Sequence, residues 1–325
     1  MSATVLCFGE ILLRLSSPNK ELLLQSARFD TQVGGAEANV AVSLSKLGHA
    51  AAMVSTLPDS PLGRACAGEL QRHGVRTDML RFRDGRMGLY FLTHGAGHRP
   101  AEVLYDRAGS AFASANADTY DWNALLAGCN WLHVSGITPA VSDAAGEAAM
   151  RAMAAARQRG VKISFDCNFR ARVWGARAKD APAILRKLCE QADLIFGDER
   201  DFAFMLGGTA AAAFESFKQL QFIACTGRAR HSVDVQQLSG HLQSRRDTYT
   251  TRPYALYGIV DRIGAGDAFA AGVLHGLIHS FDPQKTIDFA TAAACLKHSI
   301  PGDFNLASVA DIELLLSEQQ TDVRR

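Results

Sequence analysis

The sequence lacks the features by which several classes of protein are recognised. Its 325 residues contain no apolar run long enough to span a bilayer, no block of like charge, no internal repeat and no low-complexity tract. A formal net charge of +1 gives no reason to expect nucleic acid or a membrane surface as a partner. The seven cysteines are scattered and form no C-x-x-C pair, which indicates reduced thiols rather than a disulfide framework or a zinc site.

The N-terminal residues also lack the charged region and long apolar stretch of a signal peptide, so we expect a cytoplasmic protein. Hydrophobic residues make up 48% of the chain and charged residues 21%, which suits a globular protein with a substantial core. We expect one domain over residues 1–317, followed by a polar C-terminal tail at 318–325.

Short apolar runs alternate with longer helical patterns along most of the chain. This alternation predicts an α/β fold with a doubly wound, mainly parallel sheet covered by helices on both faces. The expected strands are Val5–Gly9, Ala51–Ser55, Trp131–Ser135, Lys162–Asp166, Leu194–Phe196 and Phe222–Thr226. The expected helices are Glu37–Leu47, Pro61–Arg72, Ser142–Arg159, Ala181–Glu190, Asp198–Leu206, Ala268–His279 and Pro283–Cys295.

Two segments, at about 11–33 and 81–111, interrupt this alternation. Both have extended, alternating patterns without a crossover helix, which predicts antiparallel hairpins outside the main sheet. Ligands of open α/β sheets bind beyond the carboxyl ends of the strands. We therefore expect the hairpins to form a small β lid over a ligand site at that end.

The stretch Asp261–Gly272 reads DRIGAGDAFAAG and carries the strongest chemical signal. Gly264 and Gly266 allow backbone angles closed to other residues, and Ala265 between them adds no bulk. The helix expected after them would direct its N-terminal amides at one spot, which favours a phosphate. A carboxylate at that spot, Asp267, suits a base that deprotonates an attacking alcohol. The alternative interpretation is a glycine turn in which Asp267 caps a helix.

A second glycine-rich stretch, GGAEANVA at 34–41, also precedes an expected helix. Gly34 and Gly35 permit close approach to a ligand that carries many hydroxyl groups, and Asn39 can donate to and accept from those groups. The alternative is an ordinary turn with Asn39 on the face of the helix.

The two stretches resemble the signatures G-G-x-x-x-N-x-A and D-T-x-G-A-G-D of the ribokinase-like (PfkB) carbohydrate kinases. Arg262 in place of the usual small or hydroxyl residue resembles the branch of 2-keto-3-deoxygluconate kinases. The resemblance implies a ribokinase-like fold with a β lid and an anion hole formed by Gly264, Ala265 and Gly266. It also implies that Asp267 is the catalytic base and that Gly34, Gly35 and Asn39 contact the acceptor sugar.

Arg107 and Arg170 bear on the identity of the acceptor, because a guanidinium offers a fork of donors that matches a carboxylate. The patterns around them resemble those with which 2-keto-3-deoxygluconate kinases hold an open-chain sugar acid. The alternative is that these arginines are surface or structural residues that pair with Asp106 and Asp166. The residues implied to bind substrate here are Tyr90, Tyr105, Arg107, Asn168 and Arg170, with Glu10 after the first strand as a partner for a hydroxyl.

Metal and nucleotide sites are implied by weaker matches. Asp198 and Asp201 stand where the wider family has N-x-x-E, which implies water-mediated contact with Mg²⁺, and they also suit a helix cap. Thr226 and Gly227 occupy the place of a T-x-G-x-x-G turn that faces the nucleotide, although Arg228 and the missing second glycine depart from that pattern. Ala293 and Asn305 lie in segments that resemble the surroundings of adenine.

Together these features predict a kinase that uses ATP and Mg²⁺ to phosphorylate the 6-hydroxyl of 2-keto-3-deoxygluconate. A neutral-sugar kinase of the same family, of the fructokinase or ribokinase type, is the first alternative. A non-catalytic sugar- or nucleotide-binding regulator on the same fold is the second. A dinucleotide-dependent dehydrogenase is disfavoured because the first strand ends in CFGE rather than G-x-G-x-x-G. Exposed edges of the lid make a homo-oligomer plausible.

Overall fold

The computed structural model of the chain describes residues 4–230, 232–233 and 235–317. Its strands are β1 Thr4–Phe8, β2 Leu12–Ser16, β3 Asp30–Gly34, β4 Ala50–Val54, β5 Thr56–Pro58, β6 Arg81–Arg83, β7 Gly88–Thr93, β8 Glu102–Asp106, β9 Trp131–Ser135, β10 Lys162–Asp166, β11 Leu194–Phe196, β12 Phe222–Arg230, β13 Val235–Ser244, β14 Thr248–Thr250 and β15 Tyr254–Tyr257. Its helices are α1 Ala36–Lys46, α2 Pro61–Arg72, α3 Trp122–Leu125, α4 Ile137–Val141, α5 Asp143–Gln158, α6 Ala171–Trp174, α7 Ala181–Cys189, α8 Glu199–Leu206, α9 Ala210–Ser216, α10 Ala265–Ile278, α11 Pro283–Lys297 and α12 Val309–Leu316, with short 3-10 turns η1 Ala117–Thr119 and η2 Gly175–Lys179.

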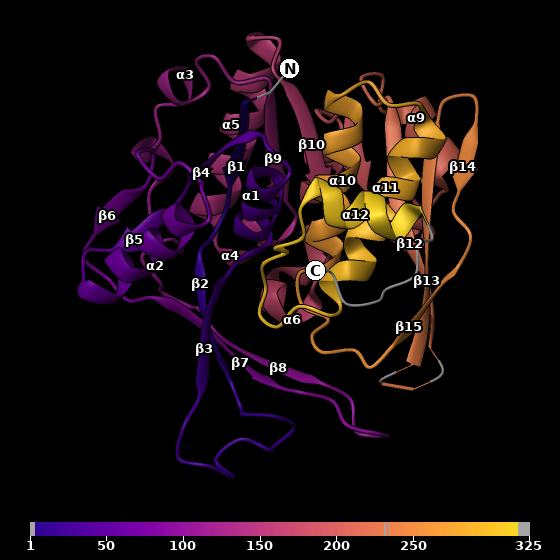
Figure 1. Cartoon of the computed structure of the whole chain (residues 1–325). Coiled ribbons are helices and arrows are strands. Elements are labelled where there is room, and N and C mark those ends of the chain that lie inside the picture. The colour runs from indigo at the N-terminus through magenta and orange to yellow at the C-terminus, as the bar shows by residue number, and fades with distance from the viewer. Residues whose placement is uncertain (1–3, 231, 234, 318–325) are drawn as a thin grey trace.

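The main sheet has the strand order β14-β13-β12-β11-β10-β9-β1-β4, with β15 paired to β13. The strands from β4 to β12 are parallel, as the single apolar runs predicted. One hydrophobic cluster joins a sheet face to α1, α2, α10, α11 and α12, and a second joins the other face to α3, α5, α7, α8 and α9. Figure 1 shows α1, α10 and α11 on one side of the sheet. The predicted α/β architecture with helices on both faces is confirmed.

The antiparallel end of this sheet differs from the sequence prediction. The strand expected to end at Thr226 continues to Arg230 and pairs along its whole length with β13. The sequence prediction missed β13 because its polar residues obscure an alternation that is visible only in the burial pattern. Thr226 and Gly227 therefore lie within a strand, and the strand end predicted at Thr226 is wrong.

The lid is a separate four-stranded sheet of order β3-β2-β7-β8. Two antiparallel hairpins, β2–β3 and β7–β8, are joined through a parallel pairing of β2 with β7. Figure 1 shows this sheet projecting below the main body, beyond the carboxyl ends of the parallel strands. One detail of the prediction is wrong, since Arg81–Arg83 lies outside the lid and pairs with β5.

Helix boundaries follow local chemistry. Ser60 caps α2 through Gly63 N, with Pro61 at the first helical position, and Ser142 caps α5 through Ala145 N. The expected helices all form, with ends shifted by a few residues at most. The proposed domain boundary at 317 stays a prediction, and the tail predicted at 318–325 lies outside the described residues.

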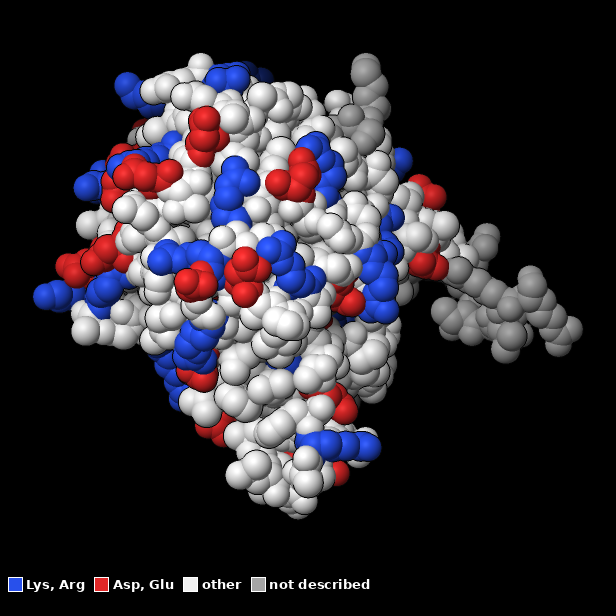
Figure 2. All heavy atoms as spheres, turned by 90° about the vertical axis from the view of Figure 1, so that its left-hand side faces the viewer, with Lys and Arg blue, Asp and Glu red and all other residues white. Residues whose placement is uncertain are grey.

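Charges of both signs are interspersed on the face seen in Figure 2, and the lid at its lower end is mostly uncharged. Among the described helices, none combines the length and the apolar character needed to cross a bilayer.

Candidate active site

The N-terminus of α10 carries a set of uncapped amides. Gly264 is the N-cap residue with φ 80°, and no side chain of the described residues caps this helix. In contrast, Ser, Thr or Asp side chains cap α2, α5, α8, α9, α11 and α12. A Cβ atom at Gly264 would lie 1.9 Å from the carbonyl oxygen of Asp303, so a glycine is required here. The first amides of α10 are left available to an anion.

Asp267 lies in the first turn of α10, and Asn39 donates a hydrogen bond of 2.7 Å from Nδ2 to its Oδ2 atom. Burial raises the pKa of Asp267 to about 7, while the bond from Asn39 acts in the opposite direction. The buried Oδ1 atom of Asn39 has no partner among the described residues. Asp267 is thus a carboxylate poised to exchange a proton near neutral pH, beside an amide oxygen that can accept from a ligand.

The second glycine-rich stretch begins α1 and lies beside this site. Gly35 has φ 138°, and a Cβ atom there would meet the carbonyl oxygen of Glu10 at 2.3 Å. A Cβ atom at Gly34 would meet Oδ2 of Asp303 at 2.1 Å. The two motifs, 228 residues apart at Asn39 and Asp267, therefore meet where close backbone contact excludes larger residues.

Glu37 fixes the start of α1 through hydrogen bonds to the end of β9 and to α4. Its Oε1 atom accepts from the backbone and hydroxyl of Ser135 and from the hydroxyl of Thr138, at 2.7–2.9 Å. Burial raises the pKa of Glu37, and these hydrogen bonds lower it. Its role here is to fix the position of α1 against the end of β9.

Other carboxylates gather at the ends of β10 and β11. Burial raises the pKa of Asp166 to about 8, with a further upward contribution from the charge of Asp267. Asp201 contributes in the same direction, while the nearby cation Arg170 lowers this pKa. The next residues make an unusual turn, since Asn168 has φ 35° and donates its backbone N–H to Asp166. The sequence interpretation missed Asp166, although its place at a strand end was a usable signal.

Arg170 lies at the exposed rim of this acidic group. Its charge lowers the pKa of Asp267 and Asp201 as well as that of Asp166. It donates to the neighbouring carbonyl of Phe169 at 3.1 Å, and within the described part of the chain no salt bridge joins it to Asp166. Among the described residues the structural pair with Asp166 is therefore absent, whereas the alternative of a surface arginine stays open.

Arg107 has a different environment, since it is buried and paired with Glu10 rather than Asp106. Its Nε donates to Oε2 of Glu10 at 2.7 Å, and Ser110 donates to the other carboxylate oxygen. The guanidinium also lies 5.7 Å from the centre of the Tyr105 ring. Asp106 pairs instead with Arg86. The structure thus joins three residues expected to bind substrate, Glu10, Tyr105 and Arg107, in one cluster.

A second buried cluster, which the sequence analysis did not predict, connects the lid to the loop that precedes α10. Arg14 from β2 pairs with Asp261 at 2.6 Å and with Asp303 at 2.9 Å. Tyr90 from β7, expected to contact substrate, is buried and donates to Asp303 at 2.5 Å. Asp261 also accepts from the amides of Ile263 and Gly302. Because Asp261 begins the glycine loop, this cluster fixes the loop relative to the lid.

The two aspartates expected near a metal form a helix cap. The side chain of Asp198 accepts from the amides of Arg200 and Asp201, and Asp201 accepts from the amide of Asp198. Arg200 adds an ion pair to Asp198. The capping interpretation is confirmed, while contact with Mg²⁺ stays a prediction.

The residues expected around the nucleotide lie in the packed interior or within a strand of the main sheet. Ala293 has no exposed surface, and Asn305 is 1% exposed with its Oδ1 bonded to the amide of Ala307. Both belong to the packed interior rather than to an open surface, and their contact with ATP stays a prediction. Thr226 and Gly227 are half-buried and lie opposite Gly240 and Ser239 in the sheet.

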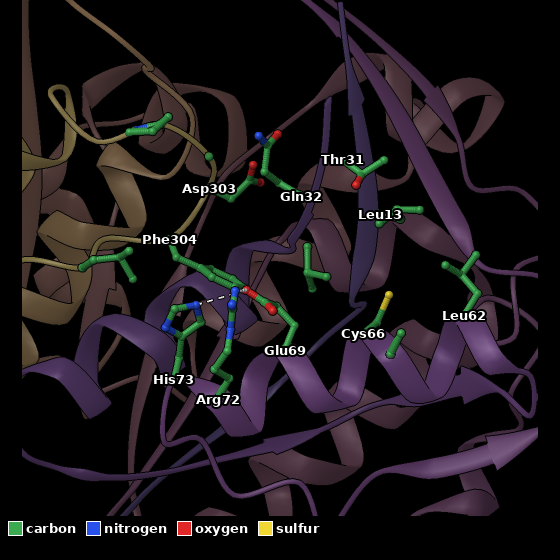
Figure 3. Close-up of a pocket in the computed structure, with 15 residues that line it drawn as sticks. Leu13, Thr31, Gln32, Leu62, Cys66, Glu69, Arg72, His73, Asp303 and Phe304 are labelled. Atoms are coloured by element: carbon green, nitrogen blue, oxygen red, sulfur yellow. Dashed lines mark hydrogen bonds and ion pairs between the residues drawn. The ribbon is translucent and has the colours of Figure 1, made fainter. Parts of the chain in front are cut away.

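A pocket of about 490 Å³ lies between the base of the lid, α2 and the loop at 301–306. Figure 3 shows Gln32 and Asp303 on one side of the pocket and the Glu69–His73 pair on α2 and its C-cap on the other. Asp303 is the residue shared with the buried cluster that fixes the glycine loop. The predicted catalytic residues do not line this pocket.

Comparison with known proteins adds the following findings. A model of the pfkB family of carbohydrate kinases matches residues 2–305. The chain is 32% identical over 319 residues to 2-dehydro-3-deoxygalactonokinase of Haloferax volcanii, covering 97% of each chain. It is 38% identical to the crystal structure of 2-dehydro-3-deoxygluconokinase from Thermotoga maritima, with a TM-score of 0.93 and coverage of 97% of this chain and 99% of that chain. A carbohydrate kinase structure from Listeria grayi is 36% identical, also with a TM-score of 0.93, covering 97% of this chain and all of that chain.

Proposed function

The chain belongs to the pfkB family of carbohydrate kinases, and we propose that it phosphorylates the 6-hydroxyl of a 2-keto-3-deoxy sugar acid. The family and the structural matches confirm the ribokinase-like fold and a phosphotransferase that acts on an alcohol group. One observation carries the proposal furthest. A carboxylate with a pKa of about 7, Asp267, lies in the uncapped first turn of α10.

In this proposal Asp267 takes the proton from the acceptor hydroxyl as its oxygen attacks the γ-phosphorus of ATP. General-base assistance of this kind contributes about 10²–10⁴ in rate. The amides of the Gly264–Gly266 turn and the start of α10 stabilise negative charge on the transferred group. Asn39 orients the carboxylate through its 2.7 Å bond and offers Oδ1 to the acceptor. The lid excludes water, which would otherwise compete as acceptor.

The carboxylates beside Asp267 suit Mg²⁺, which prefers oxygen ligands and retains several waters. Burial and the charges of Asp267 and Asp201 raise the pKa of Asp166, while burial and the charge of Asp198 raise the pKa of Asp201. A divalent cation would relieve this repulsion between carboxylates. Asp166, Asp198 and Asp201 would hold the ion, mostly through water. When bound, Mg²⁺ supplies neutralisation of the phosphate charges.

The sugar-acid assignment draws on two relatives whose names are those of keto-deoxy sugar-acid kinases, and on the cations of the site. Arg170 is exposed at the rim, so its fork can meet the carboxylate of an incoming acid. Arg107 would act together with Glu10 and Tyr105, which hold it in place and can bond hydroxyl or keto groups. A neutral acceptor would leave Arg170 without a substrate partner.

The test of the substrate is ADP release with Mg²⁺ and ATP against five acceptors: 2-keto-3-deoxygluconate, 2-keto-3-deoxygalactonate, gluconate, fructose and ribose. We expect turnover of the keto-deoxy acids with kcat/KM at least about 100-fold above that of the neutral sugars. A neutral sugar has no carboxylate and therefore leaves Arg170 without a partner. A preference for fructose or ribose would overturn the sugar-acid assignment and favour the neutral-sugar kinase.

Substitution of Arg170 tests how the acid is recognised. Arg170→Ala should raise KM for the keto-deoxy acid roughly 10- to 100-fold, since a charge-assisted bond contributes about 1.5–3 kcal/mol. The matched control is Arg172→Ala, because Arg172 is an exposed neighbour in the same helical turn. Equal effects of the two substitutions, or an equal effect of Arg170→Ala on any neutral sugar that reacts, would contradict this role.

A further inference from the structure

We propose that His49, His275 and His279 form a binding site for a divalent transition-metal ion, on the opposite side of the molecule from the lid. Their ligand nitrogens all lie within 4.8 Å of one another. His275 lies in the last turn of α10 and His279, four residues on, is its C-cap, so their side chains project from the same side of the helix end. His49 immediately precedes β4 and therefore lies at the amino end of the parallel strands.

The two buried members of this cluster already face each other. Nε2 of His49 lies 2.9 Å from Nδ1 of His275, with ring centres 5.0 Å apart. Three nitrogens around a tetrahedral zinc ion are separated by about 3.3 Å, given metal–nitrogen bonds of about 2.0–2.1 Å. A small opening of the His49–His275 pair would therefore admit an ion in place of the shared proton.

The third histidine is oriented in the way that metal ligands usually are. Nδ1 of His279 lies 3.1 Å from the carbonyl oxygen of His275. Because a carbonyl can only accept, this nitrogen carries the hydrogen, and the lone pair of His279 is left on Nε2. Ligating histidines commonly donate their second N–H to a backbone carbonyl in this manner. His279 is exposed, so its ring can adjust to complete the site.

The surroundings enclose the cluster and, in the described part of the chain, leave one polar atom without a partner. His49 is 5% exposed, and its Nδ1 atom has no partner among the described residues. Phe289 stacks on His275 with ring centres 4.7 Å apart and walls off one side of the cluster.

The donor set selects the kind of ion. Three imidazoles without a carboxylate suit Zn²⁺, Co²⁺, Ni²⁺ or Cu²⁺, whereas Mg²⁺ requires oxygen ligands. This site is therefore chemically distinct from the one proposed for Mg²⁺ at the lid end. With three protein ligands, a fourth position is left for water. Bound metal would link the C-terminal end of α10 to the segment between α1 and β4 and would stabilise the folded chain.

The test is binding of Zn²⁺ and Co²⁺ to the whole chain after treatment with a chelator. We expect one ion per chain, a rise in Tm with Zn²⁺, and the visible absorption of four-coordinate Co²⁺. His279→Ala, a substitution at an exposed position, should weaken this binding at least about 10- to 100-fold and abolish the Tm shift. His98→Ala, at another exposed histidine, should leave both unchanged.

The design separates this site from the other donors in the chain. Cysteines and the acidic cluster at the lid end are the same in wild type and both variants, so any metal bound there cancels in the comparison. Equal affinity of wild type and His279→Ala would overturn the proposal. An octahedral Co²⁺ spectrum, or no Tm shift in the wild type, would also overturn it.

Discussion

At the scale of single residues, Asp267 and Asn39 form the pair on which the chemistry depends. Burial of Asp267 disfavours the ionised carboxylate and raises its pKa, while the hydrogen bond from the amide of Asn39 stabilises the ionised form and lowers the pKa. The result is a pKa of about 7, which places the proton equilibrium of the base close to working pH. An aspartate with its ordinary pKa would be ionised but a weaker base.

This balance predicts a pH dependence with a definite sign. The base acts only when deprotonated, so kcat/KM should fall about tenfold per pH unit below about 7. Asn39→Ala removes a bond that favours the ionised form, so this acid limb should move to higher pH by about one unit. The measurement is kcat/KM between about pH 5 and 9 for both proteins. An unmoved limb in Asn39→Ala would contradict the link between the two side chains.

At the scale of secondary-structure elements, the fold leaves two helix N-termini uncapped by side chains where the two glycine-rich motifs meet. The lid is fixed to this point by Arg14, whose guanidinium joins β2 to the carboxylates of Asp261 and Asp303. The same three charges hold the glycine loop in place. The same buried cluster therefore determines the geometry of the glycine loop and attaches the lid to it.

Substitution of this arginine tests the coupling. Arg14→Met removes the cation and leaves two buried carboxylates without compensation, which should destabilise the protein by about 3–5 kcal/mol. The measurement is the free energy of unfolding in urea, with kcat of the folded fraction as a second readout. Arg86→Met, which removes an exposed pair to Asp106, is the control and should have little effect. A similar small effect of both would contradict the anchoring role.

The elements differ in how well the sequence predicted them. The helices and parallel strands follow from apolar periodicity and local caps, and they form close to the predicted positions. The antiparallel strands β13, β14 and β15 at the sheet edge were missed. Glutamine and histidine residues occupy several positions of β13 and obscure its alternation of more and less buried residues. The Arg14–Asp303 pair spans 289 residues, and no local pattern reports a contact of that separation.

The candidate site shows the same division. Asp267 and the glycines stand in contiguous strings whose chemistry can be inferred before folding. The location of Asp166 beside them, and the engagement of Tyr90 by Asp303 and of Arg107 by Glu10, depend on how the lid docks. Ala293 was assigned by similarity of a segment alone; it is fully buried in α11, and its contact with the nucleotide stays a prediction.

At the scale of the whole molecule, one face of the lid sheet is apolar and only partly buried. The strand pairing places Leu13, Leu15, Leu89, Phe91 and Leu104 on one face, opposite the one that carries Arg14 and Tyr90. Leu104 is 56% exposed. An apolar sheet face of this kind commonly marks an interface between proteins. We propose that two copies of the chain pair through the lid.

This proposal predicts a dimer that one substitution disrupts. Leu104→Asp places a charge on the apolar face at the edge strand β8 and should shift the molar mass measured by light scattering from dimer towards monomer. The control is Tyr257→Asp on β15, which is 74% exposed and outside the lid. A wild-type protein that is monomeric at all concentrations, or a dimer unaffected by Leu104→Asp, would refute pairing through this face.

The central claim is that the Asp267 carboxylate is the base of the phosphoryl transfer, and the Asp267→Asn variant tests it most directly. Asparagine keeps the size and can still accept from Asn39, and removal of a buried carboxylate with a raised pKa should not lower Tm at neutral pH. We predict that kcat with a keto-deoxy acid falls by about 10²–10⁴ while the affinities for ATP and acceptor, measured by calorimetry, stay close to those of the wild type. A variant that binds both ligands and turns over at the wild-type rate would contradict the account.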